Sequence, residues 1–156
     1  MTEAYLCTGR RSAIGRFGGA LAQTRPDDLL AHVIRATLAD VPTLDPAAID
    51  DVIMGCANQA GEDNRNVARM SSLLAELPIQ AGGETVNRLC ASGMAATLNA
   101  SRAIKDNAGD IYISGGVGDF EGCAELISYD YSAPIYDGTG IVFLEQSSCT
   151  DSFCDP

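Results

Sequence analysis

The sequence predicts an α/β fold in which helices lie in layers on a mostly parallel, mixed five-stranded sheet. Short apolar runs alternate with amphipathic helical stretches, in the order typical of consecutive βαβ units. One of these runs, Val52–Cys56, is continuously apolar, as expected for a parallel strand buried on both faces. The 156 residues, 46% of them apolar, suffice for one domain with its own core.

The first strand is expected at Ala4–Thr8. The loop that follows, residues 9–19, contains three arginines and four glycines. Such a loop can bind an anion, yet this one matches neither the P-loop nor the dinucleotide-binding fingerprint. Two interpretations therefore remain open, an anion-binding loop and a solvated connection.

The first helix is expected to begin at Pro26-Asp27-Asp28, where a proline and two acids form a helix-start signal. Pro42 and Pro46 should end it. His32 lies off the apolar stripe of this helix, so we expect a surface histidine and not a catalytic base. The stripe recurs at three- and four-residue spacing and consists of Leu29, Leu30, Val33, Ile34, Thr37, Leu38 and Val41.

The remaining elements continue the alternation. After the strand at Val52–Cys56 and a polar loop, apolar residues at helical spacing predict a second helix that Pro78 closes: Val67, Met70, Leu73, Leu74 and Leu77. Further strands are expected at Glu84–Arg88, Asp110–Ser114 and Gly140–Glu145, with a helix at Met94–Lys105. The turn Tyr136-Asp137-Gly138 precedes the last strand, Phe120–Leu126 is a helical turn or a loop, and residues 147–156 form a frayed tail.

Cys90 is the candidate functional residue, because it lies where a predicted strand turns into a predicted helix. The N-terminus of a helix favours an anion, which makes a thiolate nucleophile more available. Gly93 removes a side chain where a carbonyl could approach the backbone. Burial as an apolar core residue is the alternative for a cysteine of this kind.

Composition excludes several classes of function. The net charge of −11, with no lysine or arginine after Lys105, argues against nucleic acid and membrane surfaces as partners. The six cysteines form no CxxC pair and the single histidine is His32, which argues against a metal site. Without an export signal or a membrane-spanning run, we expect reduced thiols in a cytoplasmic protein.

Four segments resemble the N-terminal half of the thiolase family, in the right order and at compatible spacing between about residues 4 and 117. They are Ile14–Gly19, Gly55–Arg69, Val86–Met94 and Ser114–Val117. The Val86–Met94 segment, Val-Asn-Arg-Leu-Cys-Ala-Ser-Gly-Met, is the most specific of them. Within the family, the closest likeness is to acetyl-CoA acetyltransferases and 3-oxoadipyl-CoA thiolases.

The resemblance implies a chemistry for Cys90. In thiolases the matching cysteine attacks the keto carbonyl of a 3-oxoacyl-CoA, acetyl-CoA leaves, and the shortened acyl group remains on sulfur until a second coenzyme A removes it. Coenzyme A is then a substrate, and no cofactor is bound permanently. Sulfur suits this exchange because its thioesters transfer their acyl group readily.

The chain also departs from the family pattern. Thiolases use a histidine and a second cysteine from a C-terminal half, which this sequence does not contain, and Gly118-Asp119-Phe120-Glu121 differs from the usual family residues. Residues 1–146 are therefore expected to form a thiolase-like N-terminal domain without the inserted loop domain. Cys123, Cys149 and Cys154 match no family motif.

Two functions follow as hypotheses. The chain is part of an acyl-CoA C-acyltransferase and needs a C-terminal half from a partner, or it is a truncated, non-catalytic domain that pairs with an intact thiolase. The family also implies a homodimer, joined near the strand before Cys90, and a domain without its other half should expose apolar surface. The arginines of residues 10–16 and the polar run Glu62–Arg69 could serve such an interface or remain solvated.

Overall fold

The computed structural model describes residues 3–13, 20–21, 23–57, 65–118 and 140–146. Several sequence predictions lie outside these residues: those for Phe120–Leu126, for the turn at 136–138 and for the tail at 147–156. The same holds for Arg16, for residues 62–64 of the run Glu62–Arg69, and for the cysteines at 123, 149 and 154.

The core of the fold is a mixed sheet with the strand order β1-β5-β4-β2-β3. The strands are β1 (Ala4–Arg11), β2 (Asp51–Gly55), β3 (Glu84–Val86), β4 (Ile111–Gly116) and β5 (Gly140–Gln146). β2 is parallel to both β3 and β4, whereas β5 is antiparallel to both β1 and β4. β1 to β4 therefore run in one direction and β5 in the other, so the prediction of a mostly parallel sheet is confirmed.

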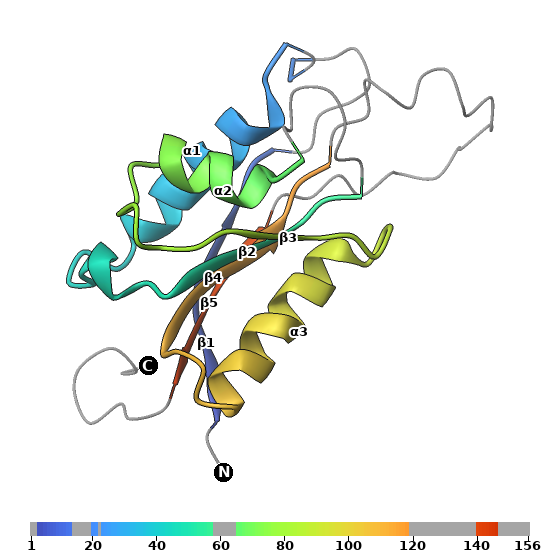
Figure 1. Cartoon of the computed structure of the whole chain (residues 1–156). Coiled ribbons are helices and arrows are strands. Elements are labelled where there is room, and N and C mark those ends of the chain that lie inside the picture. The colour runs from blue at the N-terminus through green and yellow to red at the C-terminus, as the bar shows by residue number, and fades with distance from the viewer. Residues whose placement is uncertain (1–2, 14–19, 22, 58–64, 119–139, 147–156) are drawn as a thin grey trace.

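Helices cover both faces of the sheet (Figure 1). α1 (Pro26–Leu38) and α2 (Val67–Leu74) lie on one face, and α3 (Ser92–Lys105) lies on the other. Val52 and Met54 of β2 pack in the cluster with α1 and α2, while Ile53 between them packs against α3. Because both faces of β2 are covered, its sequence is a continuous apolar run, as predicted.

α1 forms where the proline and the acids predicted it. Pro26 occupies the first turn together with Asp27 and Asp28, where negative charge favours the helix dipole. Leu30 and Ile34 are fully buried at helical spacing, and His32 between them is exposed, as expected. The helix ends at Leu38. A short 3-10 helix, Pro46–Ala48, follows before β2.

The apolar stripe predicted for α2 is buried only in part, because Val67 and Leu77 are in the core whereas two leucines between them are not. Leu73 and Leu74 are 42% and 39% exposed. The other buried residues of the helix and its C-cap are small: Ala68, Ser71, Ser72 and Ala75. The hydroxyls of Ser71 and Ser72 donate to carbonyls one turn earlier in the helix, which satisfies these polar groups inside the core. Small side chains allow α2 to approach the sheet closely, and this tertiary contact outweighs the pattern of large apolar residues.

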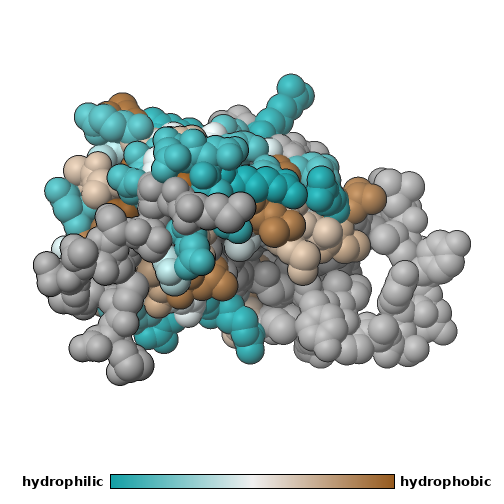
Figure 2. All heavy atoms as spheres, turned by 90° about the horizontal axis from the view of Figure 1, so that it is seen from below, coloured by the Kyte–Doolittle hydropathy of each residue, from teal (hydrophilic) through white to brown (hydrophobic). Residues whose placement is uncertain are grey.

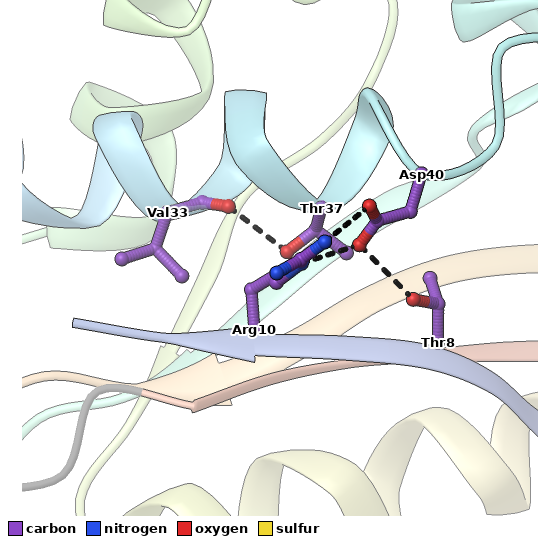
Figure 3. Close-up of polar contacts among 5 residues, drawn as sticks. All are labelled: Thr8, Arg10, Val33, Thr37 and Asp40. Atoms are coloured by element: carbon purple, nitrogen blue, oxygen red, sulfur yellow. Dashed lines mark hydrogen bonds and ion pairs between the residues drawn. The ribbon is translucent and has the colours of Figure 1, made fainter.

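β1 continues beyond the predicted end at Thr8, into the segment predicted as a loop. It pairs with β5 as far as Arg11, which lies opposite Gly140, and this distant partner extends the strand. Arg10 donates to both carboxylate oxygens of Asp40 at 2.6 Å, and Thr8 reaches the same carboxylate (Figure 3). The hydrogen bond from Arg10 lowers the pKa of Asp40. The pair joins β1 to the residues just after α1, so Arg10 contributes to the fold. Most of the loop predicted to bind an anion or to be a solvated connection, residues 14–19, lies outside the described residues.

Large apolar side chains also reach the surface, and Figure 2 shows brown apolar spheres between teal polar ones on the face seen from below. Among the described residues, those most exposed are Leu6, Ile79, Leu89 and Met94, each at 65% or more. No helix in the described part of the chain combines the length and apolarity needed to cross a membrane.

Candidate functional site

Cys90 lies at the edge of the sheet where the parallel strands end. β3 ends at Val86 and α3 begins at Ser92, and we call the connecting residues 87–91 the elbow. The thiol of Cys90 is exposed, so the alternative of a buried core cysteine is wrong for this residue. In open α/β sheets, ligands bind outside the carboxyl ends of the strands. The elbow occupies such a position beside the ends of β2 and β4.

Glycines bring the first turn of α3 directly onto the sheet. A Cβ added at Gly55, the last residue of β2, would lie 2.1 Å from the carbonyl carbon of Ser92 and 2.3 Å from the nitrogen of Gly93. At Gly116, the last residue of β4, the nearest atom would be the Cα of Gly93 at 3.0 Å. Backbone therefore packs against backbone here. This close contact fixes the position of the helix start, two residues after Cys90.

The elbow has an unusual backbone at Leu89, whose φ of 51° lies in the left-handed region. The amide of Ala91 donates to the carbonyl of Arg88 at 3.1 Å, and the amide of Ser92 donates to the carbonyl of Leu89 at 3.0 Å. These bonds form a tight turn that carries Cys90 at its outer side. The side chain of Leu89 is 72% exposed, so its packing does not account for the conformation.

Side chains on both sides of Cys90 complete this turn. The amide of Arg88 donates to Ser92 Oγ at 2.8 Å, and the same hydroxyl donates to the carbonyl of Leu89 at 2.6 Å. Asn87 accepts from the amide of Leu89 through Oδ1 and donates through Nδ2 to the carbonyl of Ala57, both at 3.0 Å. Since Ala57 follows β2, the elbow is tied to a neighbouring strand as well as to its own helix.

A second polar network fixes the start of β3. Asn66 caps α2 by accepting from the amide of Arg69, and its Nδ2 donates to the carbonyl of Gly83. Thr85 Oγ1 donates to Asn66 Oδ1 at 2.9 Å and accepts from the amide of Ala68. The N-terminus of α2 and the strand that leads to Cys90 are thereby held together.

Within the described part of the chain, the histidine and the other two cysteines belong to other segments than the elbow. His32 is on α1, which covers the opposite face of the sheet from α3 (Figure 1). Cys7 is exposed on β1, and Cys56 is buried after the end of β2. Within the described residues, no three His, Cys, Asp or Glu side chains gather in a way that could hold a metal ion. An exposed thiol on a rigid turn is the chemical feature that this edge of the sheet presents, and a thiol can form a thioester.

Asn87 and Ser92 were not predicted to have a role of their own. A signal for Asn87 was present, because asparagine commonly accepts from the amide two residues further on, and Leu89 is that residue. Ser92 gave a weaker signal, since serine is favoured at helix starts in general. Its bond to the amide of Arg88, four residues earlier, depends on the folded turn.

Comparisons with known proteins agree with this arrangement. A family model described as "Thiolase, N-terminal domain" matches residues 4–122, which include the elbow. The chain is 59% identical over 117 residues to the 3-oxoadipyl-CoA/3-oxo-5,6-dehydrosuberyl-CoA thiolase of Escherichia coli strain K12, covering 75% of this chain and 29% of that protein. It is 54% identical over 115 residues to the β-ketoadipyl-CoA thiolase of Pseudomonas knackmussii, covering 74% of this chain and 29% of that protein.

The fold has a solved counterpart as well. The acetyl-CoA acetyltransferase of Bacillus anthracis superposes with a TM-score of 0.69 at 32% identity, over 75% of this chain and 29% of the other. The chain thus spans 29% of the length of each of these relatives. By its sequence match over residues 4–122 and by its fold, the chain belongs to the thiolase family.

Proposed function

We propose that this chain supplies the nucleophile of an acyl-CoA C-acyltransferase of the thiolase type, with Cys90 as the residue that carries the acyl group. Residues 1–146 form the N-terminal domain in this proposal. The observation that carries it is the exposed thiol of Cys90 on a turn braced by hydrogen bonds, in a chain whose matched relatives are named thiolases. Cys56, by contrast, is buried and unsuited to meet a substrate.

The proposed reaction has two steps. The sulfur of Cys90 bonds to the keto carbonyl carbon of a 3-oxoacyl-CoA, and the bond between that carbon and the adjacent methylene breaks. The methylene leaves as the enolate of acetyl-CoA and takes up a proton. The acyl thioester on Cys90 then passes to the sulfur of a second coenzyme A, which regenerates the thiol. The names of the relatives favour 3-oxoadipyl-CoA as the substrate. We propose the degradation of aromatic compounds as the context, because the resemblance to 3-oxoadipyl-CoA thiolases implies it.

We propose further that turnover needs the groups of a thiolase C-terminal half in addition to the described residues. The enolate requires a proton donor and an oxyanion site, and the thiol requires a base. His32 is part of α1, and α1 lies on the face of the sheet opposite α3 (Figure 1), so this histidine does not supply the base. General acid and base groups contribute ~10²- to 10⁴-fold each, so the chain alone should show a trace of activity at most.

The edge strand β3 favours association with another chain. β3 is the last strand at one edge of the sheet, and within the described residues it pairs with β2 alone. The open edge of a strand offers unpaired backbone groups to a partner. We propose a homodimer through this edge, or association with a thiolase C-terminal half. Light scattering should give a mass above that of one 16.3 kDa chain, and a monomer under all conditions would contradict the homodimer.

In the alternative, the chain is a non-catalytic domain that pairs with an intact thiolase protomer. The observation in its favour is the position of His32, which leaves Cys90 without a histidine from the described residues of this chain. The two functions differ in one measurable respect. Only the enzyme transfers an acyl group to Cys90.

The test uses intact-mass spectrometry of the chain with acetyl-CoA, alone and with the separately produced C-terminal portion of the Escherichia coli relative. We expect the mass of one acetyl group to be added in the presence of that portion, and its loss on addition of coenzyme A. Cys90→Ala should abolish the adduct. Cys7→Ala is the matched control, because Cys7 is also exposed but lies on β1. Absence of the adduct in the combined sample would contradict the enzymatic function and leave the pairing module.

A further inference from the structure

Ser92 fixes the backbone of the elbow from the helix side. Its hydroxyl accepts from the amide of Arg88 and donates to the carbonyl of Leu89. The residue is only 4% exposed, so both bonds are shielded from competing water. The residues before Cys90 are thereby bound to the first residue of α3.

Asn87 fixes the elbow from the strand side. Its Oδ1 accepts from the amide of Leu89, and its Nδ2 donates to the carbonyl of Ala57 after β2. One side chain therefore binds both the turn that carries Cys90 and the neighbouring strand end. Movement of the turn relative to the sheet would break these bonds.

Leu89 is the point at which both side chains act. Its amide is bound by Asn87 and its carbonyl by Ser92, on either side of a left-handed residue. A leucine does not adopt this conformation readily, because its Cβ approaches the following carbonyl. The two side chains thus hold a conformation that the backbone disfavours. Since Leu89 directly precedes Cys90, its dihedral angles set the direction in which the thiol points.

We infer that Asn87 and Ser92 are positioning residues for the acylation of Cys90: they hold its sulfur in the orientation from which it attacks an acyl carbonyl. This inference rests on the proposed function of Cys90. In the step with acetyl-CoA, the sulfur of Cys90 bonds to the carbonyl carbon and the bond from that carbon to the sulfur of coenzyme A breaks. The departing thiolate gains the proton that Cys90 loses. A misplacement of about 1 Å at such a step costs on the order of 10²-fold in rate.

The test compares two reactions of the same thiol. Asn87→Ala and Ser92→Ala are combined with the C-terminal portion of the Escherichia coli relative, and acetylation of Cys90 by acetyl-CoA is timed by mass spectrometry. Alkylation of Cys90 by iodoacetamide is timed on the same samples. We expect acetylation to fall ~10- to 10²-fold, because it requires one direction of attack. Alkylation should stay within about threefold of wild type, because a small reagent reaches an exposed thiol from many directions.

Conservative variants separate positioning from support of the fold. Ser92→Thr keeps the hydroxyl and should recover most of the lost acetylation. Asn87→Asp keeps the acceptor for the amide of Leu89 but loses the donor to the carbonyl of Ala57, so it should recover only part of it. Thr97→Ala is the matched control on the same helix, where a hydroxyl donates to the carbonyl of Gly93 one turn beyond the elbow. It should acetylate at the wild-type rate.

Each outcome decides between the ideas. A wild-type sample that forms no acetyl adduct overturns the proposed function and this inference together. A wild-type adduct with unchanged acetylation in both alanine variants overturns the inference alone. Parallel changes in acetylation and alkylation also overturn it, because the side chains then merely support the fold. Selective loss of acetylation with recovery in the conservative variants supports it.

Discussion

Replacement of Gly55 by alanine should displace the elbow, because the new methyl group has no space. Its Cβ would lie 2.1 Å from the carbonyl carbon of Ser92, 2.3 Å from the nitrogen of Gly93 and 2.4 Å from the carbonyl oxygen of Ser92. All three are backbone atoms, so no side chain can rotate away. Cβ contacts below 3.0 Å essentially do not occur. The first turn of α3 therefore has to move by roughly 1 Å in a closely packed interior.

Two quantities follow from this displacement. Overpacking of this kind costs about 1–3 kcal/mol in the free energy of unfolding. For a domain of this size, each kcal/mol lowers the melting temperature by roughly 2–4 °C. A shift of roughly 1 Å at the start of α3 should also slow the acetylation of Cys90 by ~10²-fold. Circular dichroism melting and timed mass spectrometry measure the two effects.

Gly93→Ala is the matched control for stability. Its Cβ would meet its nearest atoms, in Gly115 and Gly116, at 3.6 Å or more, which is ordinary contact. Alanine is the better helix former by up to about 1 kcal/mol, so this variant should melt at or above the wild-type temperature. A Gly55→Ala variant that melts like wild type and acetylates Cys90 at the wild-type rate would refute the expected displacement of α3.

Three further variants test the energetics of the fold. Leu89→Gly should raise the free energy of unfolding by up to about 1 kcal/mol, measured by urea unfolding, because glycine tolerates the φ of 51°; a loss would show that the leucine side chain contributes more than its strain costs. The pKa of Asp40 is lowered from its usual value of 3.8, so the ionised carboxylate stabilises the fold at pH values above 3.8. Wild type should therefore have a higher melting temperature than Asp40→Asn near neutral pH and lose this advantage as the pH falls below 3.8. An equal difference in melting temperature at all pH values would contradict the ion pair. Burial raises the pKa of Asp51, so stability falls as the pH rises from 3.8 to the raised value. Asp51→Asn, which keeps an acceptor for the amide of Val52, should match wild type at about pH 3 and melt above it at about pH 7; the reverse order would be inconsistent with a raised pKa.

The elements that sequence predicted well are those that obey a local rule. The apolar stripe of α1 faces the core because Leu30 and Ile34 recur at the helical period. The apolar run of β2 is buried on both faces because helices cover both. In both cases the residue pattern alone indicates which side chains of the element are buried.

The elements predicted poorly depend on distant partners. β1 extends to Arg11 because β5, more than a hundred residues later in the chain, pairs with it. α2 turns Ser71 and Ser72 inward because the close approach of helix and sheet favours small residues there. Neither partner is visible from the local sequence.

For the candidate site, the sequence singled out one residue but not the arrangement of the residues around it. Cys90 stood out through its place at a strand–helix junction and through the family motif around it. The left-handed backbone of Leu89 did not stand out, because leucine has no local preference for it. The bonds from Asn87 and Ser92 hold that conformation, and they exist only once the turn has formed.

The central claim, that Cys90 carries the acyl group, is tested most directly by trapping that group from a cleavable substrate. The chain and the C-terminal portion of the Escherichia coli relative are mixed with 3-oxoadipyl-CoA, without coenzyme A, and the peptides are mapped by mass spectrometry. We predict a succinyl group on the peptide that contains Cys90, with release of acetyl-CoA, and its transfer away as succinyl-CoA when coenzyme A is added. A succinyl group on Cys7, or acetyl-CoA release that persists in Cys90→Ala, would contradict the account.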